Sequence, residues 1–177
     1  MARSFLEASP RGGAWFESAT ESFAAARGRQ SSSIKLPAIR PIHSHRTIFI
    51  SDTHLGTKGC KAEALADFLA HNECSTLFLV GDIIDGWQLK RRWYWNEAQN
   101  RVVAEILAKI DAGTRVIFVP GNHDEFARDY IGRVFAAIEI AGETIHETAD
   151  GKRLLVLHGD RFDGVIACAK WLAHVGD

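Results

Sequence analysis

Residues 77–85, Leu-Phe-Leu-Val-Gly-Asp-Ile-Ile-Asp, decide how the rest of this chain is interpreted. Four consecutive apolar residues are typical of a buried parallel strand, and the glycine and first aspartate mark the polar loop that follows it. Ligands of open α/β sheets collect at the carboxyl ends of such strands. The stretch therefore predicts an α/β fold with a polar site at one edge of its sheet.

Three further polar clusters follow hydrophobic runs in the same way. They are Asp52-x-His54 after residues 47–50, Gly121-Asn122-His123-Asp124 after residues 116–119, and His158-Gly159-Asp160 after residues 154–157. Because each cluster lies at the end of a predicted strand, we expect the four to converge. Carboxylate, amide and imidazole groups in this combination suit hard or borderline divalent metal ions.

The predicted elements alternate between strand and helix, which is typical of a mostly parallel sheet. We predict strands at 47–51, 76–81, 115–119, 138–140, 143–148 and 153–157, and helices at 60–72, 93–111, 125–136 and 164–175. The apolar face of the first helix is expected to consist of Ala64, Leu65, Phe68 and Leu69. Gly113 is expected to end the second helix, and Asp150-Gly151 to form a hairpin turn.

Residues 1–45 differ from the rest of the chain. They hold three of the four prolines and a run of three serines, and their apolar periodicity is poor. We therefore predict a disordered or non-conforming N-terminal extension over 1–45 and one domain over 46–177.

The overall composition restricts the class of protein. The 177 residues are 46% hydrophobic and 24% charged, and the net charge of −1 gives no general attraction to nucleic acids or membranes. Cys60, Cys74 and Cys168 are odd in number and widely spaced, which favours inert thiols in a reducing compartment. No run reaches transmembrane length and no signal peptide is recognised, so a cytoplasmic location is expected.

The polar clusters predict specific metal ligands. Asp52 and His54 would face one side of an extended segment and hold one ion together. Asp82, directly after Gly81, is placed to bridge two ions. Asn122 offers a neutral carbonyl oxygen and His158 an imidazole. Two such ions can clamp a phosphate and generate a hydroxide between them.

Other members of the clusters suit roles beside the metal. His123 is predicted to protonate the leaving oxygen as a general acid, with Asp85 holding it in the useful tautomer. Asp124 and Asp160 are expected to orient neighbouring groups rather than to bind metal.

Together these motifs resemble the calcineurin-like metallophosphoesterases. Residues 79–87 and 158–163 are most similar to the bacterial UDP-2,3-diacylglucosamine pyrophosphatase branch. The resemblance covers residues 46–177 and implies an αββα sandwich with a dinuclear site, usually active with manganese. By the family pattern, Asp52 and His54 hold the first metal, Asp82 bridges, and Asn122 and His158 hold the second. The donor set also admits iron or zinc.

Two departures from the family pattern matter. Protein phosphatases of the superfamily carry arginine where this chain has Gly86, so a phosphoprotein substrate is not expected. The family also supplies a later Gly-His-x-His, one histidine for each metal, and no such motif follows His158. We therefore expect the N-terminal part of a metallophosphoesterase with an incomplete sandwich, weak metal binding and poor turnover.

The resemblance implies hydrolysis of a P–O bond by a metal-bridging hydroxide. The favoured substrate is UDP-2,3-diacylglucosamine of lipid A assembly, or a related nucleotide-linked or lipid phosphate. The alternatives are a broad phosphodiesterase and a catalytically impaired fragment with weak metal binding. Peripheral contact with the inner membrane is expected, whereas the absent basic groove argues against a nucleic-acid substrate.

Four arginines are candidates for substrate contacts. Arg91 and Arg92 lie in segment 89–95, which mixes basic and aromatic residues and is predicted to meet phosphate, uridine or a lipid headgroup. The alternative is the start of a helix, with Trp93 or Trp95 in the core and solvated arginines. Arg128 and Arg161 follow the last two polar clusters and are further candidates for phosphate contacts.

Overall fold

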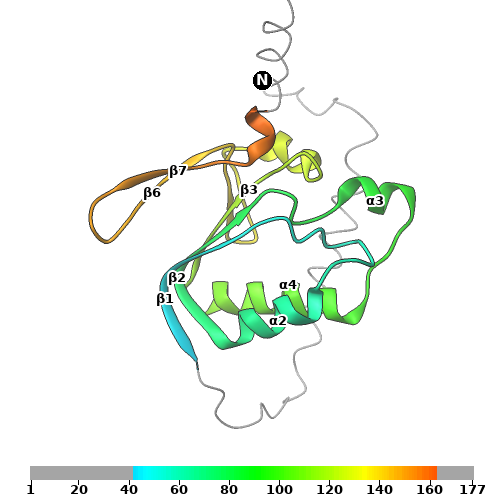
Figure 1. The fold of residues 1–177 in the computed structure, drawn as a ribbon, viewed down its shortest axis with the longest axis horizontal. Coiled ribbons are helices and arrows are strands. Elements are labelled where there is room, and N and C mark those ends of the chain that lie inside the picture. Colours follow the sequence, from blue (N-terminus) through cyan, green and yellow to red (C-terminus); the bar gives the residue numbers. More distant parts are fainter. Residues whose placement is uncertain (1–41, 163–177) are drawn as a thin grey trace, which may run out of the picture. The chain divides into compact units, whose positions relative to one another are not determined.

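The computed structural model describes residues 42–162 (Figure 1). Its main sheet has five strands in the order β1-β2-β3-β5-β4. They are β1 (His43–Ile50), β2 (Asn72–Val80), β3 (Arg115–Val119), β4 (Val134–Phe135) and β5 (Ile138–Ile140). The first three and β5 run parallel, and β4 pairs antiparallel with β5. The predicted α/β class with a mostly parallel sheet is confirmed.

Two helices cover one face of this sheet, α2 (Ala62–His71) and α4 (Glu97–Asp111), as Figure 1 shows. The apolar run of β2 is buried from Leu77 to Leu79, at exposed fractions of 0–5%. A central parallel strand is covered on both faces, which explains why its sequence does not alternate.

A hairpin lies against the opposite face of the sheet. It consists of β6 (Thr144–Glu147) and β7 (Arg153–Val156), paired antiparallel. Val156 packs with Phe78, Ile117 and Val119, side chains of β2 and β3. Gly151 adopts φ 78°, so the hairpin turn predicted at Asp150-Gly151 is confirmed. Residues 42–162 thus form a helix layer, a five-stranded sheet and a two-stranded sheet.

The segment between β2 and α4 differs from the prediction. A short helix that was not predicted, α3 (Gly86–Arg91), begins directly after Asp85, whose side chain accepts the backbone N–H of Gln88. The helix predicted from residue 93 begins at Glu97, because Asn96 caps it through the N–H of Gln99. Gly113 adopts φ 95° after the helix, as predicted for its end.

Three other predicted elements need correction. Strand β1 begins at His43 rather than at residue 47. The helix predicted over 125–136 is a 3-10 helix, η1 (Glu125–Tyr130), followed by β4. Ala64 is exposed, and Phe68 is 42% exposed. The prediction for Leu69 is confirmed, and Leu65 packs against the core. The rest of the buried face of α2 consists of Ala62 and Ala66, because small side chains allow the close approach of α4.

The two cysteines within residues 42–162 have the inert character that was predicted. Cys74 is buried, Cys60 is half-buried and both are free thiols. Burial raises the pKa of both thiols, so they stay protonated at neutral pH.

Several predictions fall outside the described range. They include the helix at 164–175, Cys168 and almost all of the extension at 1–45. Among residues 42–162, no helix is both long and apolar enough to span a membrane.

Gln99 joins α4 to the loop that follows His54. This side chain is 1% exposed, accepts the N–H of Gly56 at 3.2 Å and donates to the carbonyl of Thr57 at 3.1 Å. Replacing Gln99 by leucine should lower the free energy of unfolding by about 2 kcal/mol, because both backbone groups lose their partner. Urea unfolding measures the effect. The exposed Arg101 on the same helix, replaced by leucine, is the control, and an equal loss in both variants would contradict this role.

Candidate metal centre

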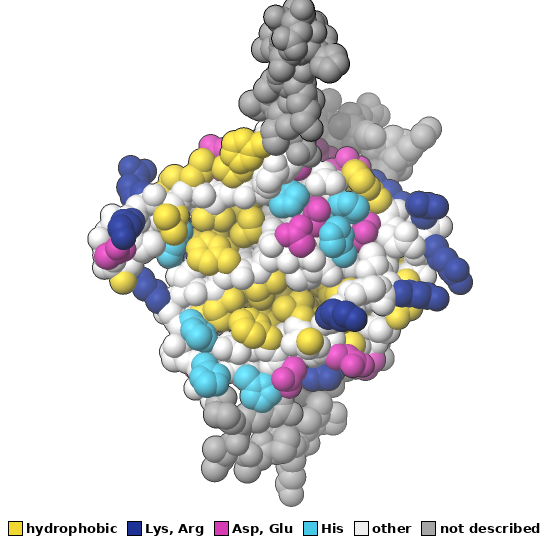
Figure 2. Space-filling view, in the orientation of Figure 1, with side chains coloured by type: hydrophobic (Ala, Val, Ile, Leu, Met, Phe, Trp, Pro, Cys, Tyr) yellow, Lys and Arg dark blue, Asp and Glu magenta, His cyan; other side chains and the backbone are white. Residues whose placement is uncertain are grey.

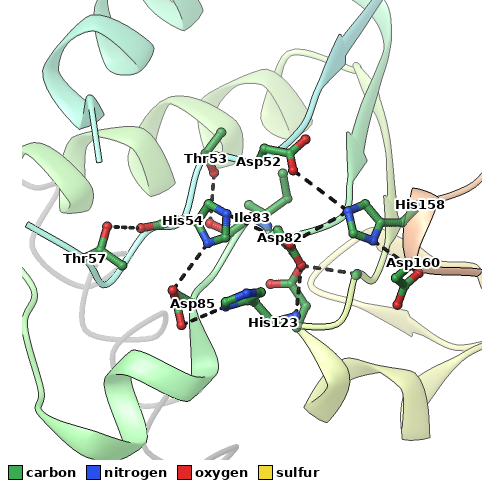
Figure 3. Close-up of polar contacts among 12 residues, drawn as sticks. Asp52, Thr53, His54, Thr57, Asp82, Ile83, Asp85, His123, His158 and Asp160 are labelled. Atoms are coloured by element: carbon green, nitrogen blue, oxygen red, sulfur yellow. Dashed lines mark hydrogen bonds and ion pairs between the residues drawn. The ribbon is translucent and has the colours of Figure 1, made fainter. Parts of the chain in front are cut away.

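Backbone hydrogen bonds bring the strand-end loops together. The N–H of Asp52 donates to Gly81, and the N–H of His54 donates to Asp82 at 2.9 Å. On the other side of Asp82, its carboxylate accepts the N–H of His123 at 2.9 Å. The four predicted clusters therefore meet at one edge of the sheet, as Figure 3 shows for their side chains.

The loop that carries Asp52 and His54 is not extended, and the geometry predicted for this pair is wrong. Asp52 and His54 adopt φ 53° and 47°, and Asp82 also adopts φ 53°. These are three of the five non-glycine residues with positive φ in the described part of the chain. Such backbone costs energy and is typically retained at functional sites. It turns the Asp52 and His54 side chains toward different partners.

The side chains form two groups that share Asp82. One consists of His54, Asp82 and His123, and the other of Asp52, Asp82 and His158. Within each group, one ligand atom from each residue lies within 4.8 Å of the others. Nε2 of His158 lies 3.8 Å from Oδ2 of Asp82 and 4.0 Å from Oδ1 of Asp52. Asp82 is buried, the three histidines are half-buried and Asp52 is exposed, and imidazole and carboxylate groups at this spacing fit a pair of divalent metal ions.

Two glycines make this convergence sterically allowed. A Cβ on Gly81 would lie 2.0 Å from Cδ2 of His158, so a side chain at this position would displace the histidine. A Cβ on Gly121 would lie 2.3 Å from Oδ1 of Asp82. The half-buried Asn122, the predicted amide ligand, follows Gly121 directly and is therefore in the loop nearest to the shared carboxylate.

Asp85 lies between two histidines of the site. Its carboxylate oxygens are 3.2 Å from Nδ1 of His123 and 3.4 Å from Nδ1 of His54. Burial alone would raise the pKa of Asp85, but the N–H of Gln88 and the two imidazoles outweigh burial, and the pKa is lowered. The carboxylate therefore stays ionised. The structure places it where it can orient His123, whose role as general acid stays a prediction.

Asp160 contacts the opposite side of His158. Oδ1 of Asp160 lies 3.2 Å from Nδ1 of His158, and both atoms are buried without a hydrogen bond inside the described chain. The guanidinium of Arg128 pairs with the other oxygen of Asp160. Carboxylates in this position orient metal-binding histidines and direct Nε2 at the ion. Arg128, a predicted phosphate contact, thus already has an acidic partner.

Asp124 joins two of the loops. Its side chain is fully buried and accepts the N–H groups of Ile83 and Ile84 at 2.9 and 2.7 Å. The expectation that Asp124 orients backbone is confirmed by these bonds. Burial raises the pKa of Asp124 to about 6, although the backbone N–H groups act in the opposite direction.

The remaining predicted arginines lie on the surface. Arg91 and Arg92 are exposed, and Arg161 is 3.7 Å from Glu143. The sequence reasoning missed Trp87, whose ring centroid lies 4.3 Å from that of His123. Trp87 follows Asp85 by two residues in the sequence, and this closeness to a predicted site residue is the signal that could have identified it as part of the site.

The contact between Asp160 and His158 predicts an effect on metal affinity. Replacing Asp160 by alanine should weaken Mn²⁺ binding by about 10- to 100-fold, since His158 loses the group that orients it. Isothermal titration calorimetry of the chain with Mn²⁺ measures this. Asp129, an exposed residue directly after Arg128 in the sequence, provides the matched Asp129→Ala control. Unchanged affinity in the Asp160 variant would contradict the role.

The pKa of Asp124 predicts how stability changes with pH. An unfolded aspartate titrates near 3.9, and the folded value is about 6. Between these values the folded chain binds more protons than the unfolded chain. The contribution of Asp124 to the free energy of unfolding is therefore present below about pH 4 and is lost as the pH rises through 6. Relative to Asp124→Asn, the metal-free chain should lose about 3 kcal/mol between pH 4 and 7. Urea unfolding across that range tests this. A pH-independent difference between the two proteins would refute it.

Comparisons with known proteins agree with this geometry. Residues 45–175 match the family model described as Calcineurin-like phosphoesterase. Three similar curated proteins carry the name UDP-2,3-diacylglucosamine hydrolase. The protein of Chromohalobacter salexigens is 31% identical over 64% of this chain and 46% of its own length. The protein of Klebsiella pneumoniae is 29% identical over 64% of this chain and 48% of its own length. The protein of Porphyromonas gingivalis is 28% identical over 63% of this chain and 45% of its own length.

The chain therefore spans about half the length of the curated relatives it matches. The family match extends over most of the chain and includes all four strand-end clusters. With the shared aspartate, the two histidine-containing groups and this match, the chain belongs to the calcineurin-like phosphoesterase family.

Proposed function

We propose that this chain supplies ligands to a dinuclear metal centre that hydrolyses a P–O bond of a nucleotide-linked lipid phosphate, with UDP-2,3-diacylglucosamine as the favoured substrate. The observation that carries the proposal is the position of Asp82 between His54 in one group and Asp52 and His158 in the other. His123, the third member of the first group, is assigned to proton transfer below. The names of the three relatives support the substrate class. Because the chain spans half of those proteins, activity and substrate are proposed for the whole protein.

The metal ligands proposed are those expected from the sequence. Asp52, His54, Asp82, Asn122 and His158 would hold two divalent ions, with manganese favoured over iron or zinc. When bound, the ions would act as Lewis acids toward the phosphate and lower the pKa of water.

His123 is the proposed general acid. Its Nδ1 faces Asp85, and this neighbour fixes the orientation of the ring. The other ring nitrogen, Nε2, is then available to donate a proton to the leaving oxygen. The ionised carboxylate of Asp85 would keep Nδ1 facing it and Nε2 turned toward the leaving oxygen.

The substrate would meet the protein on the side of α3. Arg91 and Arg92 are the proposed phosphate contacts there. Arg128 and Arg161, which already face Asp160 and Glu143, are proposed to contact phosphate only by exchanging those partners. A lipid-linked substrate resides in a bilayer, so we propose a cytoplasmic protein that is peripheral to the inner membrane.

The proposed function predicts that metal binding and hydrolysis depend on one side chain. Asp82→Asn should abolish hydrolysis of UDP-2,3-diacylglucosamine with Mn²⁺ and weaken Mn²⁺ binding more than 100-fold, roughly the effect of removing a ligand from both ions. Calorimetry measures the metal, and release of nucleoside monophosphate measures the reaction.

Asp129→Asn, which changes an exposed aspartate, is the matched control. A second arm uses bis(p-nitrophenyl) phosphate, a simple water-soluble diester. Equal rates on both substrates would favour a broad phosphodiesterase. Full activity of Asp82→Asn would exclude the proposed centre.

A further inference from the structure

Helix α3 and the residues after it carry an exposed surface of cations and indole rings. The surface consists of Trp87, Lys90, Arg91, Arg92 and Trp93 and is called the basic–aromatic surface below. Trp87 is 43% exposed and Trp93 61% exposed. Figure 2 shows Lys and Arg side chains along the side of the molecule where α3 and its following segment lie in Figure 1.

Within the described residues, the positive charge of this surface is largely uncompensated. Lys90 lies 3.7 Å from Glu125, but neither Arg91 nor Arg92 forms an ion pair within residues 42–162. Lys58 adds a further cation beside it, with Nζ 5.9 Å from the centre of the Tyr94 ring. Because the whole chain has a net charge of only −1, this cluster is a local feature rather than a result of overall composition.

The two neighbouring tryptophans of segment 93–95 have different environments. Trp95 packs against the core and donates its indole N–H to Asn100 at 2.9 Å. Trp93 stacks on Trp95 with ring centroids 6.3 Å apart but keeps most of its own surface in water. The alternative that Trp93 or Trp95 lies in the core is therefore correct for Trp95 and not for Trp93. An indole held outward beside arginines is typical of the interface between water and lipid.

Hydrogen bonds and a ring contact join the basic–aromatic surface to the metal centre. Asp85, which contacts two site histidines, also caps α3 through the N–H of Gln88. The N–H of Gly86 donates to the carbonyl of His123 at 3.1 Å. Trp87 contacts His123 and donates its indole N–H to Glu125 at 3.2 Å. A partner bound to α3 would therefore lie within one helical turn of the site.

We propose that the basic–aromatic surface docks on a bilayer that contains anionic phospholipid. Arg91 and Arg92 would meet the phosphate groups, and Trp93 would enter the headgroup region. This inference rests on the proposed function to the extent that a lipid-linked substrate gives such docking a purpose. It places the metal centre at the level of the headgroups, so that a lipid phosphate reaches it without leaving the membrane.

Vesicle sedimentation tests the docking. The chain should bind vesicles that contain phosphatidylglycerol but not vesicles of phosphatidylcholine alone, and high salt should weaken the binding. Removing two cations with Arg91→Ala and Arg92→Ala should lower the partition coefficient roughly 30-fold. Trp93→Ala should also weaken binding, and it should reduce the blue shift of tryptophan fluorescence that vesicles induce.

A matched control removes two neighbouring cations elsewhere, at Lys152 and Arg153 on the β6–β7 hairpin. This double alanine variant should sediment with the vesicles as the unmodified chain does, and circular dichroism checks that every variant is folded. Equal loss in both double variants, or equal binding to both kinds of vesicle, would overturn the proposal. Tight binding of single-stranded RNA without vesicle binding would overturn it in favour of a nucleic-acid partner.

Metal calorimetry without vesicles separates this inference from the proposed function. Vesicle binding by a chain that fails to bind Mn²⁺ would support the docking surface and reject the proposed centre. Mn²⁺ binding that depends on Asp82, in a chain that ignores anionic vesicles, would reject the docking surface alone.

Discussion

The buried carboxylate of Asp124 accepts the N–H groups of Ile83 and Ile84 and lies within 3.4 Å of the N–H of Gly121. One side chain thereby replaces water as the partner of the loops after β2 and β3. Without it, these backbone donors would be buried and unsatisfied. The positions of Asp82, Asn122 and His123 all depend on these loops. The unfavourable burial of one negative charge is therefore the condition for bringing the ligands together.

Parallel strands explain why three of the four segments contribute to one site. The fourth segment, which carries His158, follows β7 of the antiparallel hairpin packed on the sheet. The chain must cross back over the sheet after each strand, so successive strands release their carboxyl ends at the same edge. At that edge the side chains crowd until only glycine fits at Gly81 and Gly121. Backbone strain at Asp52, His54 and Asp82 accompanies this crowding. Hydrogen bonds between the loops, rather than contacts in the hydrophobic core, hold these strained residues in place.

The strand-end clusters could be predicted because a buried strand and the polar loop after it are both visible in a short stretch of sequence. The backbone of Asp52 and His54 could not, since its left-handed conformation follows from hydrogen bonds to residues 81 and 82, about 30 positions away. The face of α2 was misjudged for a similar reason. Periodicity selects large apolar residues such as Phe68, whereas close packing of two helices selects Ala62 and Ala66. Asp160 and Arg128 likewise meet only in the folded chain.

Strand β1 lies at the edge of the main sheet, and within residues 42–162 it pairs with β2 alone. Edge strands open locally at a lower free energy than central strands and exchange their amide hydrogens sooner. Opening of β1 would withdraw Asp52 and His54, while Asp82 and Asn122 would remain on the loops after β2 and β3, and His158 after β7. Metal ions bound to Asp52 and His54 together with the other ligands would stabilise the closed state of β1. The metal concentration would therefore determine how often this strand opens.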